Sequence, residues 1–111
     1  MGIFSRAKRA DTEELEEVDF LVVGRSNYPA VKLSPGNVFH ASIRPEPKNK
    51  FDPNAIAVYV GNNQAGYLSA KSAAHHAGRF KRSMEVPAVV ATGRRGELEL
   101  YVTLMVPLLK D

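Results

Sequence analysis

The sequence predicts a mainly β protein, a small antiparallel barrel or curled sheet with one or two short helices. Three observations predict it. Apolar and polar residues alternate strictly near the C-terminus, shorter apolar runs end in turns rich in glycine or proline, and one late segment has helical periodicity. With 111 residues, the chain is long enough for one domain with its own core and too short for a second.

The first 17 residues are predicted to be a charged tail, because the run EELEE has too few apolar side chains to hold a helix against a core. The domain is then expected to span residues 18–111. It opens with a short apolar strand, VDFLVVGR, which Gly24 closes. In the next strand, GNVFHASI, the better core face consists of Phe39, Ala41 and Ile43.

Residues 44–54, RPEPKNKFDPN, are predicted to form an ordered loop. Their three prolines oppose regular strand pairing, and Asp-Pro-Asn favours a type I turn. The strand AIAVYV follows, and the polar GNNQ returns the chain toward AGYL in a hairpin. We assign Asn54 to the turn and Gly66 to close packing of the backbone.

One helix is expected within residues 69–83, SAKSAAHHAGRFKRS, with Ser69 as its cap. Its apolar stripe consists of Ala73, Ala77 and Phe80. A second hairpin, EVPAVVAT and ELELYVTLMV joined by GRRG, completes the domain. The inward positions of its last strand are predicted to be Leu98, Leu100, Val102, Leu104 and Val106.

Charge is unevenly distributed along the chain. Residues 1–17 carry three basic and five acidic side chains, a net charge of −2, so the remaining residues hold 12 basic against 7 acidic and a net charge of +5. A basic domain favours polyanionic partners. The sequence lacks cysteine, a membrane-spanning apolar run and a signal-peptide core, so we expect a cytoplasmic protein with no membrane partner.

No catalytic or metal constellation is expected. His75 and His76 are adjacent on the predicted helix, so they point about 100° apart and cannot present two imidazoles to one metal; His40 lies on a separate strand. Tyr67 stands where a phosphate loop needs lysine. The arginines of GRRG are expected to be solvated. We therefore predict no cofactor, no metal and no enzymatic activity.

One dense motif remains, an E-P-x-N-x-[YF]-D-x-N-A-I-x-V loop and strand followed by G-Y-L. On these residues the segment 36–80 resembles the HIRAN domain. The matching residues are Glu46, Pro47, Asn49, Phe51, Asp52, Asn54, Ala55, Ile56, Val58, Gly66, Tyr67 and Leu68.

The resemblance implies a barrel related to the OB fold that binds single-stranded DNA and captures its 3′ end, as in fork-remodelling ATPases. By position, Phe51 would stack on the terminal base and Asp52 would accept a hydrogen bond from the terminal hydroxyl, with Asn49 nearby. A helicase or nuclease is a further partner to consider.

Phosphate contacts are less well defined by the sequence. Lys48, Lys50 and Arg44 are candidates beside the motif. The family's basic and aromatic residues after the first strand are replaced by GRSNY, where Arg25 or Tyr28 would substitute. Ser69 stands at a position that is often basic, with Lys71 two residues later.

Two alternatives stay open. Asp before Pro-Asn is an ordinary turn residue, and a phenylalanine in a loop is commonly a partly buried core plug. In that case the domain would be a protein interaction module, an adaptor of the same fold that does not bind DNA.

Overall fold

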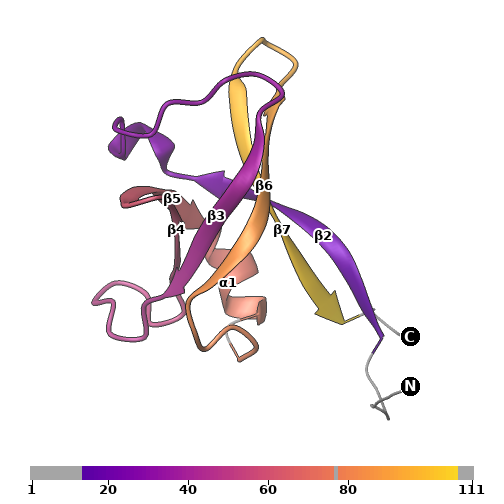
Figure 1. Cartoon of the computed structure of the whole chain (residues 1–111). Helices are drawn as coiled ribbons and strands as arrows, with labels where there is room; N and C mark the ends of the chain where they lie inside the picture. Colours follow the sequence, from indigo (N-terminus) through magenta and orange to yellow (C-terminus); the bar gives the residue numbers. More distant parts are fainter. Residues whose placement is uncertain (1–13, 77, 108–111) are drawn as a thin grey trace.

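The computed structural model describes residues 14–76 and 78–107 (Figure 1). Six antiparallel strands close into a barrel in the order β2-β5-β4-β3-β6-β7. The strands are β2 (Leu15–Val23), β3 (Val38–Pro45), β4 (Ile56–Val60), β5 (Asn63–Leu68), β6 (Met84–Thr92) and β7 (Leu98–Pro107), with a 3-10 helix η1 (Arg25–Asn27) and one short α-helix, α1 (Ala70–His76). The predicted fold class, a mainly β, OB-like antiparallel barrel, is confirmed.

Strand β2 begins at Leu15, within the segment predicted to be a tail. Residues 15–17 pair with residues 105–107 of β7, in a ladder that continues to the pair of Leu21 with Tyr101. Backbone pairing needs no apolar side chain on the outward face, so the acidic composition of this segment does not prevent a strand. The barrel wall is longer at this end than the hydrophobic pattern predicts.

The core lies inside the barrel and follows the predicted alternation. Ala41 and Ile43 of β3 are buried and Phe39 packs against them from the edge. The predicted face of the last strand is equally clear: Leu100, Val102, Leu104 and Val106 are buried, and Leu98 is partly buried against the core. Side chains of a strand alternate between two faces, so the period-two pattern is sufficient to orient both strands.

Helix α1 closes one end of the barrel and is shorter than predicted. Ser69 caps it as expected, because its Oγ accepts a hydrogen bond from the backbone N–H of Ser72 at 3.2 Å. Ala73 is buried, but the helix ends at His76; Ala77 lies outside the described residues. Phe80 still reaches the core, from a turn in which the N–H of Arg79 donates to the carbonyl of His76 at 2.9 Å.

Gly66 allows β5 to approach β2 closely, as predicted. A Cβ built at this position would contact the carbonyl oxygen of Val23 and would lie 2.8 Å from Cγ1 of Val22. This approach is where β2 and β5 pair, at Val22 with Leu68 and Val23 with Tyr67. Because only a residue without a side chain fits here, Gly66 contributes to closing the barrel.

The β4–β5 hairpin is tighter than the sequence indicates. Val60 pairs directly with Asn63, so only Gly61 and Asn62 form the turn, and the last two residues of GNNQ belong to β5. Gly61 has φ of 60°, the left-handed conformation that two-residue hairpin turns require. Among the described residues, no helix is long and apolar enough to cross a membrane.

Candidate nucleic-acid interface

The loop between β3 and β4 is closed by its own backbone. The N–H of Glu46 donates to the carbonyl of Ala55 at 2.8 Å, the N–H of Asn49 to Glu46 at 2.9 Å, and the N–H of Ala55 to Asp52 at 3.0 Å. Three bonds within ten residues give this proline-rich segment a defined shape without strand pairing. The predicted ordered loop is therefore confirmed for residues 46–54. Arg44 and Pro45, which the prediction placed in the loop, instead end β3 and pair with Ala57 and Ile56 of β4.

Asn49 fixes the tip of this loop. Its Oδ1 accepts the backbone N–H groups of Phe51 at 2.9 Å and Asp52 at 3.0 Å. Its Nδ2 donates to Glu46 Oε1 at 2.9 Å, and the hydroxyl of Tyr67 donates to the same carboxylate oxygen at 2.9 Å. The Glu46 carboxylate thus ties the loop to β5, so hydrogen bonds hold the backbone from which the Phe51 side chain projects.

A pocket of about 480 Å³ lies under this loop tip. Its lining consists of Val23, Tyr28, Asn49, Phe51, Asp52, Ala55, Tyr67, Leu68 and Ala70. The rings of Tyr28 and Tyr67 meet edge to face, 6.4 Å between centroids. The structure therefore gathers three aromatic rings, one amide and one carboxylate from three separate segments of the chain.

The Phe51 ring is not a core plug. Its side chain is 97% exposed although it contributes to the pocket wall. Asp52 does have the turn role, since its Oδ1 accepts the N–H of Asn54 at 2.9 Å, which also confirms the assignment of Asn54 to the turn. The second carboxylate oxygen of Asp52 has no hydrogen bond from the described residues.

The basic residues predicted to contact phosphates fall into two groups, lysines that are exposed near the pocket and arginines that contact other parts of the protein. Lys48 and Lys50 are exposed on the loop beside the pocket, and Lys71 is exposed on α1, next to the pocket residue Ala70. Arg25 instead donates from its guanidinium to the carbonyl of Leu98 at 2.7 Å. Arg44 lies over the ring of Tyr59, 3.8 Å from its centroid. The two arginines do not line the pocket.

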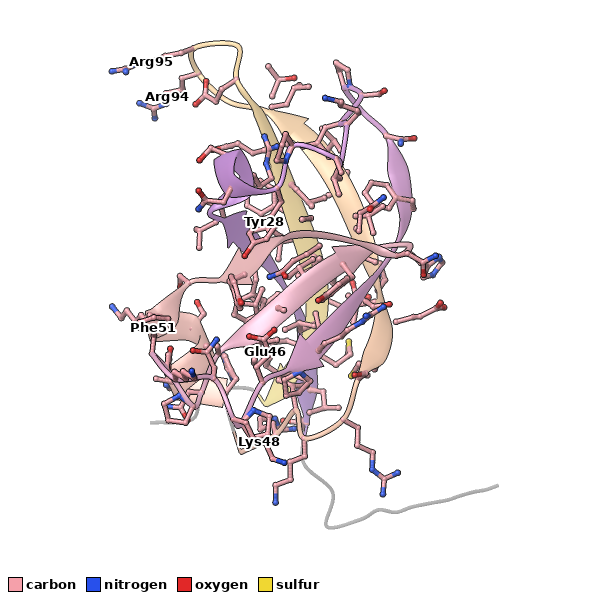
Figure 2. The ribbon with its side chains drawn as sticks, turned by 90° about the vertical axis from the view of Figure 1, so that its left-hand side faces the viewer. Tyr28, Glu46, Lys48, Phe51, Arg94 and Arg95 are labelled. Atoms are coloured by element: carbon pink, nitrogen blue, oxygen red, sulfur yellow. The ribbon has the colours of Figure 1, made fainter. Side chains whose placement is uncertain are left out.

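Figure 2 shows Phe51 and Tyr28 on the same side of the barrel, with Glu46 below Tyr28 in this view and Lys48 near the opposite end of the molecule from the β6–β7 turn. Arg94 and Arg95 project from that turn, well away from Phe51 (Figure 2). The turn is held by its backbone and by Glu97, whose Oε1 accepts the N–H of Arg95 at 2.9 Å.

Glu46 and Tyr67 are site residues that the sequence analysis did not assign a role. Both belong to the matching motif, so the signal was present. A sequence pattern does not show that the two side chains, 21 residues apart, meet at one hydrogen bond.

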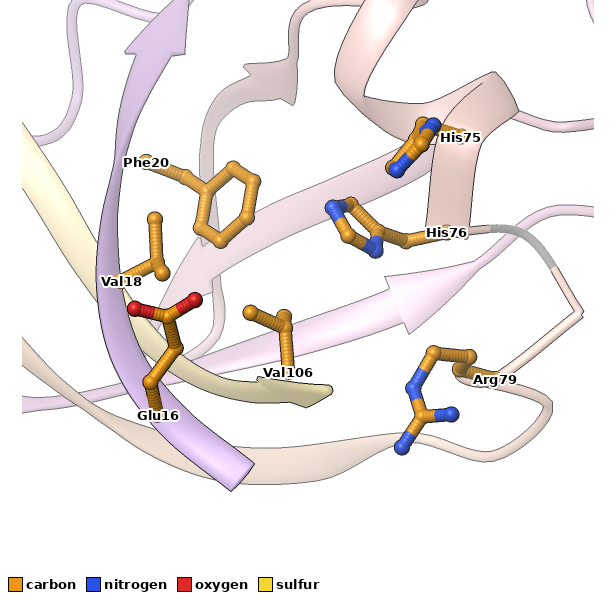
Figure 3. Close-up of a pocket in the computed structure, with 7 residues that line it drawn as sticks. All are labelled: Glu16, Val18, Phe20, His75, His76, Arg79 and Val106. Carbon is orange, nitrogen blue, oxygen red and sulfur yellow. The ribbon is translucent and has the colours of Figure 1, made fainter. Parts of the chain in front are cut away.

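A second concavity, of about 350 Å³, lies at the end of the barrel near α1 (Figure 3). Its apolar wall consists of Val18, Phe20 and Val106, and its polar rim of Glu16, His75, His76 and Arg79. The two imidazoles meet edge to face at 4.6 Å, with planes 89° apart, and the ring of Phe20 contacts His76 at 5.3 Å. The two imidazole rings are therefore in contact, although adjacent helical positions were expected to direct them about 100° apart.

The pKa of His76 is lowered from its ordinary value of 6.5, first by burial of the ring and then by the positive charges of His75 and Arg79. The unfolded chain therefore takes up this proton at a higher pH than the folded protein does. It follows that the free energy of unfolding should fall as the pH is lowered from 6.5 toward the folded-state pKa of His76.

We expect His76→Gln to remove this part of the pH dependence, because glutamine does not titrate. The measurement is urea unfolding of both proteins at a series of pH values between neutral and about 5. If the two proteins lost stability in parallel across that range, proton uptake by His76 would not be the cause.

No family model matches the chain, and no curated protein matches it. Among solved structures, the HIRAN domain of human HLTF is similar to it, with a TM-score of 0.60 and 23% sequence identity over 86% of this chain and 80% of that one. The chain therefore has the fold of a HIRAN domain, as the residues around Phe51 and Asp52 predict.

Proposed function

We propose that this protein is a non-catalytic module that binds single-stranded DNA in the pocket under the β3–β4 loop, with the 3′-hydroxyl end against Asp52. The observation that carries the proposal is the Phe51 ring, 97% exposed on a hydrogen-bonded loop beside a pocket that also contains Tyr28 and Tyr67. Single exposed apolar side chains are common. A ring held out by a hydrogen-bonded loop beside two further rings is suited to a flat ligand, and bases stack on such rings regardless of sequence.

Asp52 selects the part of the strand that would enter the pocket. A carboxylate repels a phosphodiester but accepts a strong hydrogen bond from a hydroxyl. One oxygen of Asp52 holds the turn and the other has no partner among the described residues, so it is free to accept a terminal 3′-OH. A continuing strand would place its next phosphate near this charge, which favours an end over an internal nucleotide.

Lys48, Lys50 and Lys71 are our candidates for the preceding phosphates, because their side chains are exposed on the two segments that flank the pocket. Arg25 and Arg44 are assigned a structural role instead. Their guanidinium groups already contact the Leu98 carbonyl and the Tyr59 ring. A helicase or nuclease that receives the bound strand is the kind of protein with which such a module would act.

The competing hypothesis is an adaptor that uses the same exposed Phe51 ring to hold a protein and does not bind DNA. The two hypotheses differ in their dependence on salt. Binding to a polyanion releases counterions, and burial of an aromatic ring in a protein partner does not.

We expect binding of a short single-stranded oligonucleotide to weaken with salt, with a log-log slope of about −1.5 to −3. This slope corresponds to about two to four phosphate contacts, since each contributes ~0.7 for single strands. Fluorescence anisotropy at several salt concentrations measures it. A flat response would support the adaptor hypothesis.

A matched pair of variants locates the contacts. The double substitution Lys48→Gln and Lys50→Gln should reduce the magnitude of the slope by about 1 to 1.5. The substitutions Arg94→Gln and Arg95→Gln remove the same charge from the distant β6–β7 turn and should leave the slope unchanged (Figure 2). Equal effects of the two pairs would mean that binding responds to net charge and not to this pocket.

A further inference from the structure

The outer surface of the barrel carries a row of apolar side chains that crosses four neighbouring strands. Val38 of β3 pairs with Val89 of β6, Val89 pairs with Tyr101 of β7, and Tyr101 pairs with Leu21 of β2. Directly opposed residues on adjacent strands project on the same side of a sheet. These four side chains therefore form one continuous strip, here named the apolar row.

The apolar row is accessible to a partner. Val38 is 73% exposed and Leu21 is 40% exposed, while Val89 and Tyr101 are half-buried between them. Outward positions of a barrel that has water on its outside are normally polar. An aligned strip of apolar side chains across neighbouring strands differs from scattered single ones, and such strips mark interaction surfaces.

The centre of the row faces away from the candidate DNA pocket. In the closed order of the barrel, the pair β6–β7 is separated from the pair β4–β5 by β3 on one side and β2 on the other. Loop 46–55 and Tyr67, which form much of the pocket, belong to the β4–β5 side. A partner on β6 and β7 would not occupy the same space as a strand of DNA under Phe51.

On three of the four strands that carry the row, the charged side chains are all acidic; the fourth strand, β3, carries His40, two residues from Val38, and Arg44, which lies over the Tyr59 ring. Strands β2, β6 and β7 contain no lysine, arginine or histidine, although the rest of the domain is basic. Their exposed or half-buried acidic side chains on the outer surface are Glu17, Asp19, Glu85 and Glu99. Hydrogen bonds orient two of the carboxylates: Thr103 Oγ1 donates to Asp19 Oδ1 at 2.6 Å, and the Tyr101 hydroxyl donates to Glu99 Oε1 at 3.3 Å.

The charge pattern decides between occupants. Nucleic acid and anionic lipid are disfavoured by the carboxylates. A second copy docked by the same face would place these carboxylates against each other, since a two-fold interface uses the same patch on both subunits. The pKa of Tyr101 is raised, first by the charge of Glu99 and further by burial, its bond to Glu99 and the charge of Asp19, as expected beside a negative surface.

We propose that the apolar row is a docking surface for a partner protein whose contacting segment combines apolar side chains with lysine or arginine. The apolar side chains would cover Leu21, Tyr101, Val89 and Val38, and the cations would meet Asp19 and Glu99. Electrostatic complementarity of this kind mainly gives specificity. The module would then hold a protein on one wall while the opposite wall remains open to its own ligand.

The test uses two synthetic peptides as probes, one in which leucine alternates with lysine and one in which glutamate replaces every lysine. Backbone amide NMR shifts of the full chain report where each peptide binds. We expect the lysine peptide to shift amides of β6 and β7 and to bind at least about tenfold more tightly than the glutamate peptide. Shifts confined to α1 or to the β3–β4 loop, or equal binding of both peptides, would overturn the proposal.

Variants separate the apolar contribution from the charge. The double substitution Leu21→Ser and Val38→Ser should weaken the binding of the lysine peptide by at least about fivefold. The substitution Met84→Ser removes another exposed apolar side chain from outside the row and should have no such effect. The double substitution Asp19→Asn and Glu99→Gln should reduce the ratio of the affinity for the lysine peptide to the affinity for the glutamate peptide. If the serine variant bound the lysine peptide with unchanged affinity, the peptide would be held by charge alone, and the proposal would be overturned.

Two further measurements complete the design. Oligonucleotide affinity of the serine variant should stay within about twofold of wild type, because the substituted side chains carry no charge and do not line the pocket. Sedimentation of the unmodified chain should show a monomer. A dimer that dissociates in the serine variant would make a second copy the occupant and would contradict the partner proposed here.

Discussion

Replacing Phe51 with alanine is expected to weaken the binding of a short single-stranded oligonucleotide by about 1 to 3 kcal/mol and to leave the melting temperature unchanged. The ring is almost fully exposed, so its removal leaves no cavity and exposes no core. The backbone of the loop is held through Asn49, whose bonds to the N–H groups of residues 51 and 52 do not involve the ring. Affinity and stability are therefore expected to respond separately.

Two control substitutions make this result specific. Phe51→Tyr keeps a stacking ring and should retain most of the affinity. Val38→Ala shortens another strongly exposed apolar side chain, at the opposite end of β3 from the loop, and should not affect oligonucleotide binding. A lower melting temperature with unchanged affinity per folded molecule would return Phe51 to a structural role.

The sequence predicted the strands well where one face of the strand is buried in the core. The alternation in β7 placed Leu100, Val102 and Leu104 in the core, because a half-buried strand imposes a strict period of two. The pattern gave no sign that β2 begins at Leu15. At that end the strand is held by backbone pairing with β7, and its outward side chains are free to be acidic.

The helix shows a different limit of sequence reasoning. Ala73 and Phe80 are both buried, as the stripe predicted, yet only Ala73 is helical. The spacing of seven residues is satisfied by one helical position and a following turn at Gly78–Arg79. A hydrophobic period constrains which side chains reach the core, but it does not exclude a turn that delivers one of them.

The residues of the candidate site could be predicted from the sequence, but the hydrogen bonds that join them could not. The motif brought Asn49, Phe51 and Asp52 into consideration, and GRSNY suggested Tyr28. Exposure of the Phe51 ring depends on how the loop folds back on Glu46 and Tyr67, which is a long-range property. In the same way, the partner of Arg25 is a carbonyl 73 residues away, so its basic charge alone could not show its role.

The largest expected difference between the two interpretations of Asp52 lies in the chemistry of the strand end. If its free oxygen accepts the terminal hydroxyl, wild-type protein should bind strands ending in 3′-OH more tightly than the same strands ending in 3′-phosphate. The phosphate removes the donor and places charge against charge. A hydrogen bond to a charged group contributes about 1.5 to 3 kcal/mol, so the preference should be on the order of tenfold or more.

Asp52→Asn tests the origin of this preference without dismantling the loop. The amide oxygen of asparagine has the size and position to accept the N–H of Asn54, the bond that Asp52 Oδ1 now accepts at 2.9 Å, so the turn and the melting temperature should be retained. The charge is lost, and with it the repulsion of a terminal phosphate. We therefore expect the variant to bind 3′-phosphate strands as well as wild type does or better, and to lose most of the preference for 3′-OH.

Fluorescence anisotropy on the four combinations, wild type and Asp52→Asn against 3′-hydroxyl and 3′-phosphate strands, measures this preference. Equal affinity of the wild type for both ends would rule out end capture even if single-strand binding itself were observed. An unchanged preference in the variant would assign the discrimination to another donor or acceptor in the pocket, with Asn49 as the nearest polar side chain of the same loop tip.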